Sequence, residues 1–261
     1  MANVLDAMRR HQAEQAAARL SAGPEAPEQA RAAAAAGSQA LAPVSRSVLD
    51  GYAPDLCVHH DRGGAVAEEF RRLRTSLLAQ YPDQRFCVLL TSAEKGEGTT
   101  VACLNLALVL AERQERRTVV VDCDLRARRL AKLMRMDNSP GVADLLRGSA
   151  RVRDVPRKTA YPNLFVIPAG EAGTGEIGEL LRRPELEESA NALRQEYDYV
   201  LFDTPPVGTA PDACTLGRAA SDALIIVRMH KTRRETVDSA IRLLHAANIK
   251  PVGVVLTHRR Y

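Results

Sequence analysis

From residue 65 onward, apolar positions follow two different periods along the chain. Stretches with an apolar residue every three or four positions predict helices, and short unbroken apolar runs predict strands buried on both faces. Strands are predicted over 86–91, 118–122, 164–167, 199–203, 223–228 and 252–257. Helices are predicted over 65–80, 99–113, 141–146, 176–196, 212–219 and 233–247. This alternation predicts an α/β domain with a doubly wound, mostly parallel sheet, which binds ligands at the carboxyl ends of its strands.

The beginning of the chain has a different pattern. Residues 1–20 carry a few apolar residues at helical spacing, and the following residues to about 48 are mostly Ala, Pro, Gly and Ser. A segment of this composition buries too little apolar surface to fold by itself. We therefore predict a weak helix and a flexible linker over 1–48, followed by one domain over 49–261. The alternative for the first segment is a docking site for a partner.

Composition and charge narrow the class of protein. Lys and Arg total 36 against 32 Asp and Glu, and this net charge of +4 is small for a dedicated nucleic-acid coat protein. The 5 cysteines lie far apart without a C-x-x-C pair, which excludes a disulfide scaffold and a recognisable zinc site. The start of the chain lacks the apolar core of a signal peptide, and no apolar run approaches the ~20 residues of a membrane helix. These features predict a soluble, cytoplasmic protein.

A glycine-rich turn joins the first predicted strand to a helix. Its sequence from residue 92 to residue 100 is SAEKGEGTT, and such a turn presents backbone N–H groups and a helix N-terminus to phosphates. Alignment on the second glycine places Thr99 where a P-loop has lysine and keeps Thr100 at the Mg²⁺-binding hydroxyl. Loss of such a charge-assisted contact costs about 1.5–3 kcal/mol. The cost to phosphoryl transfer is larger than the cost to nucleotide binding if the contact matters chiefly in the transition state. The predicted nucleotide-binding residues of the turn are Lys95, Gly96, Glu97, Gly98, Thr99 and Thr100.

Lys95 is the residue of this turn that could replace the missing lysine by reaching in from the loop. The alternative is a solvated loop lysine, which is common.

Two predicted strands end in aspartate. The strand 118–122 runs into D-C-D-L-R, which contains Asp122 and Asp124, and the strand 199–203 ends at Asp203 before T-P-P. Carboxylates at this edge of a parallel sheet can hold Mg²⁺ through its waters and can orient an attacking hydroxyl. A single aspartate there is often only a turn cap. Two of them downstream of a glycine-rich loop favour a nucleotide site.

Further short motifs follow in a fixed order. They are E-E-F-R-R-L-R at 68–74, T-S-A at 91–93, N-L-A at 105–107, D-C-D-L-R at 122–126, P-G-V-A-D-L-L at 140–146, P-A-G at 168–170, E-L-L at 179–181, D-T-P-P at 203–206 and G-V-V-L at 253–256. This series resembles the bacterial tyrosine kinases, or BY-kinases, of capsule and exopolysaccharide systems. They are deviant P-loop ATPases related to ParA and MinD, so the resemblance implies a sheet of the P-loop NTPase type. The ordered series is more specific than any one of its motifs.

The resemblance implies an activity and a set of site residues. The activity is that of a protein tyrosine autokinase, which uses ATP and Mg²⁺ and regulates the polymerisation or export of a polysaccharide. Asp122 and Asp203 would act on Mg²⁺, and Thr100 would complete the metal site. Asp122 or Asp124 would help to activate the tyrosine hydroxyl. Arg126, at the end of the D-C-D-L-R motif, would join the nucleotide-binding residues.

The resemblance also implies partners. Glu68, Arg71 and Arg74 would mediate self-association into a ring, because their spacing places them on one helix face where they can pair with a neighbour. The alternative is a solvated ladder of salt bridges. A separate inner-membrane chain-length or co-polymerase protein would recruit the kinase, and no nucleic acid is expected. Tyr261 is the candidate phosphorylation site, with an ordinary exposed terminal residue as the alternative.

Two other functions stay open because of Thr99 and the single C-terminal tyrosine. One is a catalytically degenerate nucleotide-binding or assembly subunit of the same machinery. The other is a ParA/MinD-like ATPase, in which the basic run 126–135 would meet DNA phosphates; a solvated helix face is the commoner explanation of such a run. The D-T-P-P motif and the helix that carries Glu68 favour the polysaccharide branch.

Overall fold

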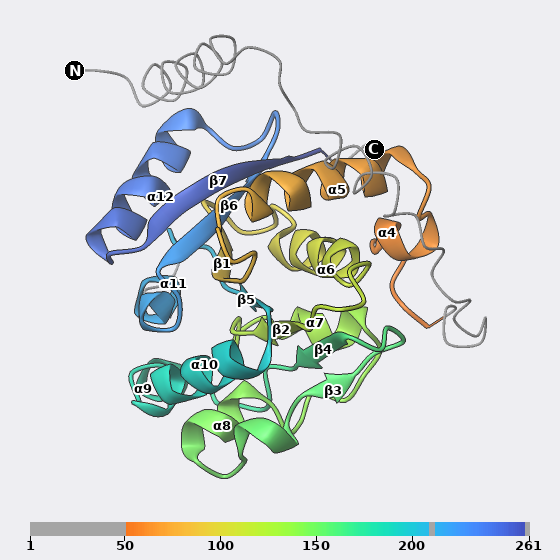
Figure 1. The fold of residues 1–261 in the computed structure, drawn as a ribbon. Helices are drawn as coiled ribbons and strands as arrows, with labels where there is room; N and C mark the ends of the chain where they lie inside the picture. The colour runs from red at the N-terminus through yellow and green to blue at the C-terminus, as the bar shows by residue number, and fades with distance from the viewer. Residues whose placement is uncertain (1–50, 209–211, 259–261) are drawn as a thin grey trace. The chain divides into compact units, whose positions relative to one another are not determined.

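The computed structural model describes residues 51–208 and 212–258 (Figure 1). The predictions for 1–48 and for Tyr261 fall outside these residues. The described part contains one sheet of 7 strands in the order β3-β4-β2-β5-β1-β6-β7. The strands are β1 (Phe86–Ser92), β2 (Thr118–Asp122), β3 (Arg157–Lys158), β4 (Leu164–Ile167), β5 (Tyr199–Asp203), β6 (Asp222–Arg228) and β7 (Lys250–Thr257).

The pairing of the strands confirms the predicted sheet. All neighbours pair in parallel except the short β3, which runs antiparallel to β4 at one edge. Five of the strands are hydrophobic on both faces, as expected for a parallel sheet covered by helices. In a parallel sheet the carboxyl ends of neighbouring strands meet at one edge, so Asp122 at the end of β2 stands opposite Asp203 at the end of β5.

Helices cover the sheet on two sides, and successive strand residues point to opposite sides (Figure 1). One apolar core contains residues of α4, α5, α6 and α7, and the other contains residues of α8, α9, α10 and α12. The helices are α4 (Cys57–His60), α5 (Ala65–Leu78), α6 (Thr99–Leu110), α7 (Arg129–Leu133), α8 (Val142–Arg147), α9 (Ile177–Leu180), α10 (Glu185–Glu196), α11 (Asp212–Thr215) and α12 (Arg234–Ala246). Short 3₁₀ turns occur at Val152–Asp154 and Leu216–Arg218.

Two of the predicted helices are interrupted. The single helix predicted over 176–196 is divided into α9 and α10, and Pro184 stands immediately before α10. Proline has no backbone N–H to donate to the preceding turn, so it interrupts a helix but is accepted at a helix start. The helix predicted over 212–219 is α11 followed by a 3₁₀ turn. The short elements α4, α7 and β3 were not predicted.

The helix α6 lies at the centre of one core. Ten of its residues are buried, on all sides, because α6 has the sheet on one side and α4 and α5 on the other. A helix that is apolar all round is stable only when it is enclosed in this way. Since α6 follows directly on the glycine-rich turn, its burial fixes the place of the turn. None of the helices within the described ranges has the length and apolar character needed to cross a bilayer.

A close backbone crossing joins the chain before α8 to the chain after β4. Val142 N donates to Pro168 O at 2.8 Å, and Gly170 N donates to Asn138 O at 2.9 Å. A methyl group added at Gly141 would lie 2.3 Å from Gly170 N and 2.3 Å from Pro168 O. The crossing therefore requires glycine at 141, and it explains why the P-G-V-A-D-L-L and P-A-G motifs occur together.

We predict that Gly141→Ala lowers the free energy of unfolding by about 2 kcal/mol or more, because two backbone segments must move apart. Urea denaturation measures the change. Gly175→Ala is the matched control, since no atom lies within 4 Å of its added methyl group, and its effect should stay within about 0.5 kcal/mol. Equal effects of the two substitutions would contradict the assignment of Gly141 to a tight crossing.

Candidate functional site

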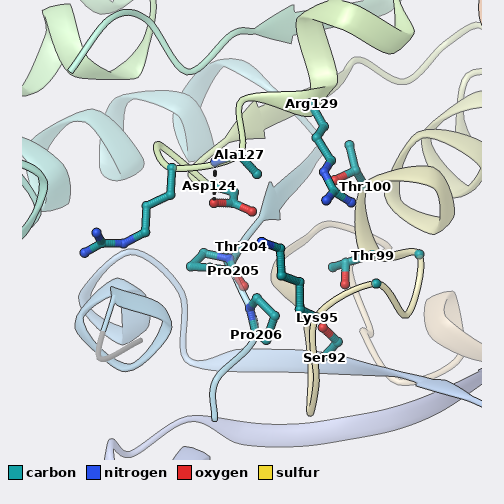
Figure 2. Close-up of a pocket in the computed structure, with 13 residues that line it drawn as sticks. Ser92, Lys95, Thr99, Thr100, Asp124, Ala127, Arg129, Thr204, Pro205 and Pro206 are labelled. Carbon is teal, nitrogen blue, oxygen red and sulfur yellow. Dashed lines mark hydrogen bonds between the residues drawn. The ribbon is translucent and has the colours of Figure 1, made fainter. Parts of the chain in front are cut away.

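A cavity of about 500 Å³ opens at the carboxyl ends of β1, β2 and β5 (Figure 2). Parts of three segments line it: 92–100 from the turn after β1, 124–129 after β2 and 204–206 after β5. These are the segments in which the sequence placed its candidate residues. The predicted residues that line the cavity are Lys95, Gly96, Gly98, Thr99, Thr100, Asp124 and Arg126.

The glycines of the turn give the loop its shape. Gly96 has a φ of 86° and Gly98 a φ of 91°, a region that only glycine adopts without strain. Gly98 precedes the first residue of α6, so the N-terminus of this 12-residue helix opens on the cavity. Backbone N–H groups at a helix N-terminus attract anions, and a phosphate chain is the anion that such a loop binds in P-loop proteins.

Glu97 has a different position from the rest of the turn. Its side chain is buried, and its Oε2 atom accepts hydrogen bonds from Ala93 N at 2.8 Å and Glu94 N at 3.0 Å. Its Oε1 atom accepts a hydrogen bond from Thr232 Oγ1, and its backbone oxygen accepts one from Thr257 Oγ1 at 2.9 Å. Glu97 does not line the cavity. Its carboxylate instead ties the turn to the connection after β6, so it acts on the shape of the loop.

Asp122 and Asp203 form a buried pair of carboxyl groups. Both residues are at most 1% exposed. Asp122 accepts hydrogen bonds from Asp124 N at 3.1 Å and Leu130 N at 3.2 Å, whereas neither carboxyl oxygen of Asp203 forms a hydrogen bond of full geometry, and the Thr100 hydroxyl favours its ionised form. Burial raises the pKa of Asp122 to about 7, and the charge of Asp124 adds to this effect. Burial and the charge of Asp122 raise the pKa of Asp203 well above its ordinary value.

This pair fits a divalent cation. Buried polar atoms are nearly always satisfied, and a cation between two such carboxyl groups would satisfy the unpartnered oxygens of Asp203. The described residues contain no group of three or more His, Cys, Asp or Glu side chains that could hold a metal by themselves. In nucleotide sites Mg²⁺ is held by one or two carboxylates together with water and substrate phosphates, so two carboxyl groups are enough for it. Thr100, which also lines the cavity, adds a hydroxyl.

Three basic side chains line the cavity where the P-loop lysine is missing. Lys95 extends toward Thr204, and Arg129 extends from the opposite wall toward Thr100 (Figure 2). Arg126 is held by Asp212, with 2.8 Å between Nε and Oδ2. Lys95 and Arg126 were predicted site residues. Arg129 was not, because the sequence shows only a basic run, and the fold decides which arginine turns inward.

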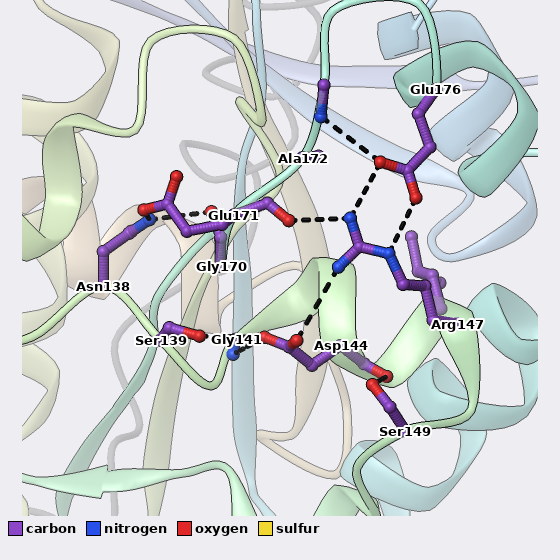
Figure 3. Close-up of polar contacts among 12 residues, drawn as sticks. Asn138, Ser139, Gly141, Asp144, Arg147, Ser149, Gly170, Glu171, Ala172 and Glu176 are labelled. Carbon is purple, nitrogen blue, oxygen red and sulfur yellow. Dashed lines mark hydrogen bonds and ion pairs between the residues drawn. The ribbon is translucent and has the colours of Figure 1, made fainter.

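The neighbouring Arg128 turns away from the cavity. It contacts Glu171, and its Nε atom donates to Leu125 O at 2.9 Å. The Glu171 side chain also accepts a hydrogen bond from Asn138 at 2.9 Å, and its backbone oxygen accepts one from Arg147 at 2.8 Å (Figure 3). This network holds the loop after β4 against the segment that follows β2.

Arg147 and Glu176 close the same network on its outer side. The guanidinium of Arg147 donates two hydrogen bonds to the Glu176 carboxylate, at 2.7 and 2.8 Å (Figure 3). The arginine lowers the pKa of Glu176 to about 2. The pair therefore stays ionised over the physiological pH range, and it links α8 to the segment that leads into α9.

The residues predicted to mediate self-association lie on α5. Arg71 Nε donates to Glu112 at 3.0 Å, Arg74 Nη1 donates to it at 2.7 Å, and Arg71 also contacts Glu68. Burial tends to raise the pKa of Glu112, but the two arginines lower it overall. Both arginines are thus engaged within the chain, while 55% of the Glu68 side chain is exposed and can be reached by a neighbour. The ring itself stays a prediction.

Comparison with known proteins gives consistent matches. Residues 88–245 match the AAA domain family. The tyrosine-protein kinase wzc of Salmonella typhimurium is 31% identical over 190 residues, which is 72% of this chain and 26% of that protein. The putative tyrosine-protein kinase CapB of Staphylococcus aureus is 26% identical over 202 residues, 77% of this chain and 88% of that protein.

The solved structure of the chimerical protein CapA2B2 has a TM-score of 0.73 at 25% identity, covering 79% of this chain and 90% of that one. Against the curated relatives from Salmonella and Ralstonia, by contrast, the chain spans about a quarter of their length.

We predict that Asp122→Asn stabilises the metal-free protein at high pH. The folded-state pKa of about 7 lies above the ordinary value of 3.8, so wild-type stability falls as the pH rises from about 4 to about 7. Asparagine does not titrate. Between pH 5 and pH 8 in EDTA, the stability of the variant relative to wild type should increase by about 2 kcal/mol or more in urea denaturation. The exposed Asp137→Asn is the control, and a variant with the pH dependence of wild type would contradict the prediction.

We predict that Glu97→Ala lowers the free energy of unfolding by about 2–4 kcal/mol, because it leaves the N–H groups of Ala93 and Glu94 without a partner. Glu97→Gln should cost less, since its amide oxygen can still accept. Glu94→Ala removes a side chain of the same type from the same turn, and it should change stability by less than about 0.5 kcal/mol. If chemical denaturation gave the same midpoint for Glu97→Ala and Glu94→Ala, the bracing role would be wrong.

Proposed function

The chain belongs to the AAA domain family. Because the similar proteins are bacterial tyrosine kinases, we propose that it is a Mg²⁺- and ATP-dependent protein tyrosine autokinase. We further propose that it regulates the polymerisation or export of a capsular or extracellular polysaccharide. The observation that carries the proposal is the buried pair Asp122 and Asp203 at neighbouring strand ends, together with a cavity that is lined by the glycine-rich turn and by the residues that follow these two strands.

The residues in and next to the cavity would have different roles in such a reaction. The turn from Gly96 to Thr100 and the N-terminus of α6 would bind the phosphates, and Asp122, Asp203 and Thr100 would hold Mg²⁺. Bound Mg·ATP would supply the phosphoryl group and a cation that neutralises its developing charge. The side chains and backbone N–H groups of the protein would contribute the positioning of the reactants and the electrostatic stabilisation of the transition state.

Asp124 is the residue that we propose to orient the tyrosine hydroxyl and to accept its proton. It lines the cavity and is partly exposed, whereas Asp122 is fully buried and beyond the reach of an incoming side chain. One oxygen of Asp124 accepts a hydrogen bond from Ala127 N at 3.0 Å, which fixes the orientation of the carboxylate. A general base must lie within hydrogen-bond reach of the proton that it takes, and Asp124 meets this requirement better than Asp122.

We also propose the partners that the family resemblance implies. The chain would form a homo-oligomer, in which the exposed Glu68 of one copy pairs with basic residues of another. It would act at the cytoplasmic side of the inner membrane, recruited by a chain-length or co-polymerase protein. The membership in the kinase family supports both proposals, and the exposure of Glu68 supports the first.

We predict that the purified chain, incubated with labelled ATP and Mg²⁺ and the cytoplasmic segment of its membrane partner, forms phosphotyrosine. Asp203→Asn should lower the rate about a hundredfold or more, because charge stabilisation at the transferred phosphoryl group is lost. Asp137→Asn, an exposed carboxylate outside the cavity, should leave the rate unchanged. Phosphopeptide mapping then tests Tyr261 as the acceptor. Nucleotide binding without any phosphotyrosine would overturn the kinase and favour a degenerate assembly subunit.

A further inference from the structure

One cation of the cavity has no part in the site described so far. Of the three basic side chains that line the cavity, Arg126 is paired with Asp212. Arg129 forms neither a hydrogen bond nor an ion pair with any residue that the structure describes. A guanidinium that points into a cavity without a partner is available for an anionic ligand, because it carries five donors and stays charged at any physiological pH.

The position of Arg129 is fixed by its backbone. It is the first residue of α7, and the preceding Arg128 has a left-handed backbone with φ 48°. The next residue, Leu130, is fully buried, and its N–H donates to Asp122 at 3.2 Å. The start of α7 is therefore anchored to one of the two candidate metal carboxylates, and Arg129 leaves the chain at the cavity wall.

The side chain of Arg129 reaches the place where the P-loop lysine is missing. In Figure 2 the guanidinium points toward Thr100, whereas the amine of Lys95 points toward Thr204, and all four residues line the same cavity. Burial and the charge of Asp122 raise the pKa of Asp203, and Arg129 is among the charges that act against this shift. In P-loops the lysine reaches the β- and γ-phosphates next to the metal-binding hydroxyl, and here Thr100 supplies that hydroxyl.

We propose that Arg129 binds the terminal phosphates of the nucleotide from the β2 side of the cavity and supplies the positive charge that Thr99 lacks. The proposal rests on the proposed nucleotide site. A planar guanidinium can hold a phosphate with two parallel hydrogen bonds, so an arginine on the opposite wall can serve where a lysine within the loop is absent. The chain thus keeps the charge of a P-loop but carries it on a different element.

A competing role is that Arg129 only neutralises the acidic pair when no metal is bound. In that case Arg129→Ala would tighten Mg²⁺ binding and leave the affinity for ATP unchanged. If Arg129 binds phosphate, its removal weakens ATP binding. The two roles therefore predict different effects of Arg129→Ala on the affinity for ATP.

Calorimetric titration of the full chain with ATP and with AMP, both in saturating Mg²⁺, tests the proposal. Arg129→Ala should raise the Kd for ATP about tenfold to a hundredfold and the Kd for AMP by less than about threefold, because AMP lacks the terminal phosphates. Arg129→Lys should fall between wild type and the alanine variant. Lys132→Ala is the matched control: it removes the same charge from an exposed position of α7 outside the cavity, and it should change neither Kd by more than about twofold.

A second variant shows whether the two positions share one task. In a Thr99→Lys background, Arg129→Ala should raise the Kd for ATP by less than about threefold, because the restored lysine carries the charge. Three results would overturn the proposal: an effect of Arg129→Ala on ATP no larger than that of Lys132→Ala, an equal loss for ATP and AMP, or no binding of ATP by the wild-type chain. Binding that depends on Arg129 in a chain that forms no phosphotyrosine would uphold this inference and overturn the kinase.

Discussion

Parallel pairing of β2 with β5 forces two carboxyl groups, Asp122 and Asp203, into neighbouring buried positions, and the rest of the site is arranged around them. Two negative charges at such a place repel each other and are poorly solvated. In the metal-free fold the pKa values of both carboxyl groups are therefore raised. The first helix turn after β2 is anchored to one of them, and the glycine-rich turn begins at the end of β1, on the other side of β5. The cavity opens where these three strand ends meet.

The surrounding fold makes this arrangement rigid. The helix α6 is enclosed between the sheet and two further helices, so its N-terminus cannot move without disturbing a core. Outside the cavity, the loop after β4 is held against the chain that follows β2 by the crossing at Gly141 and by Arg128 and Arg147. Catalysis of phosphoryl transfer depends on positioning, and the burial of α6 and the contacts of Arg128 fix two of the segments that line the cavity.

The sequence predicted the parts of the molecule that depend on local pattern. Long parallel strands are unbroken apolar runs, and the convergence of Asp122 and Asp203 follows from strand direction alone. Short elements such as α7 and β3 contain too few residues to show a period. The apolar period continues through 176–196, and only Pro184 indicates that the helix is interrupted before α10. The pattern of apolar and polar residues does not predict the direction in which a loop side chain points. Glu97 turns from the loop toward the connection after β6, and Arg129 turns inward, because of contacts between segments far apart in the chain.

The hydrogen bond from Thr257 to the backbone of Glu97 has a mechanical consequence. Thr257 belongs to β7, an edge strand of the sheet, and among the residues that the structure describes no further strand pairs with its outer side. The glycine-rich turn and this edge strand are thus joined by one hydrogen bond. A protein that added a strand alongside β7 would therefore bind next to a residue that holds the glycine-rich turn, without touching the cavity.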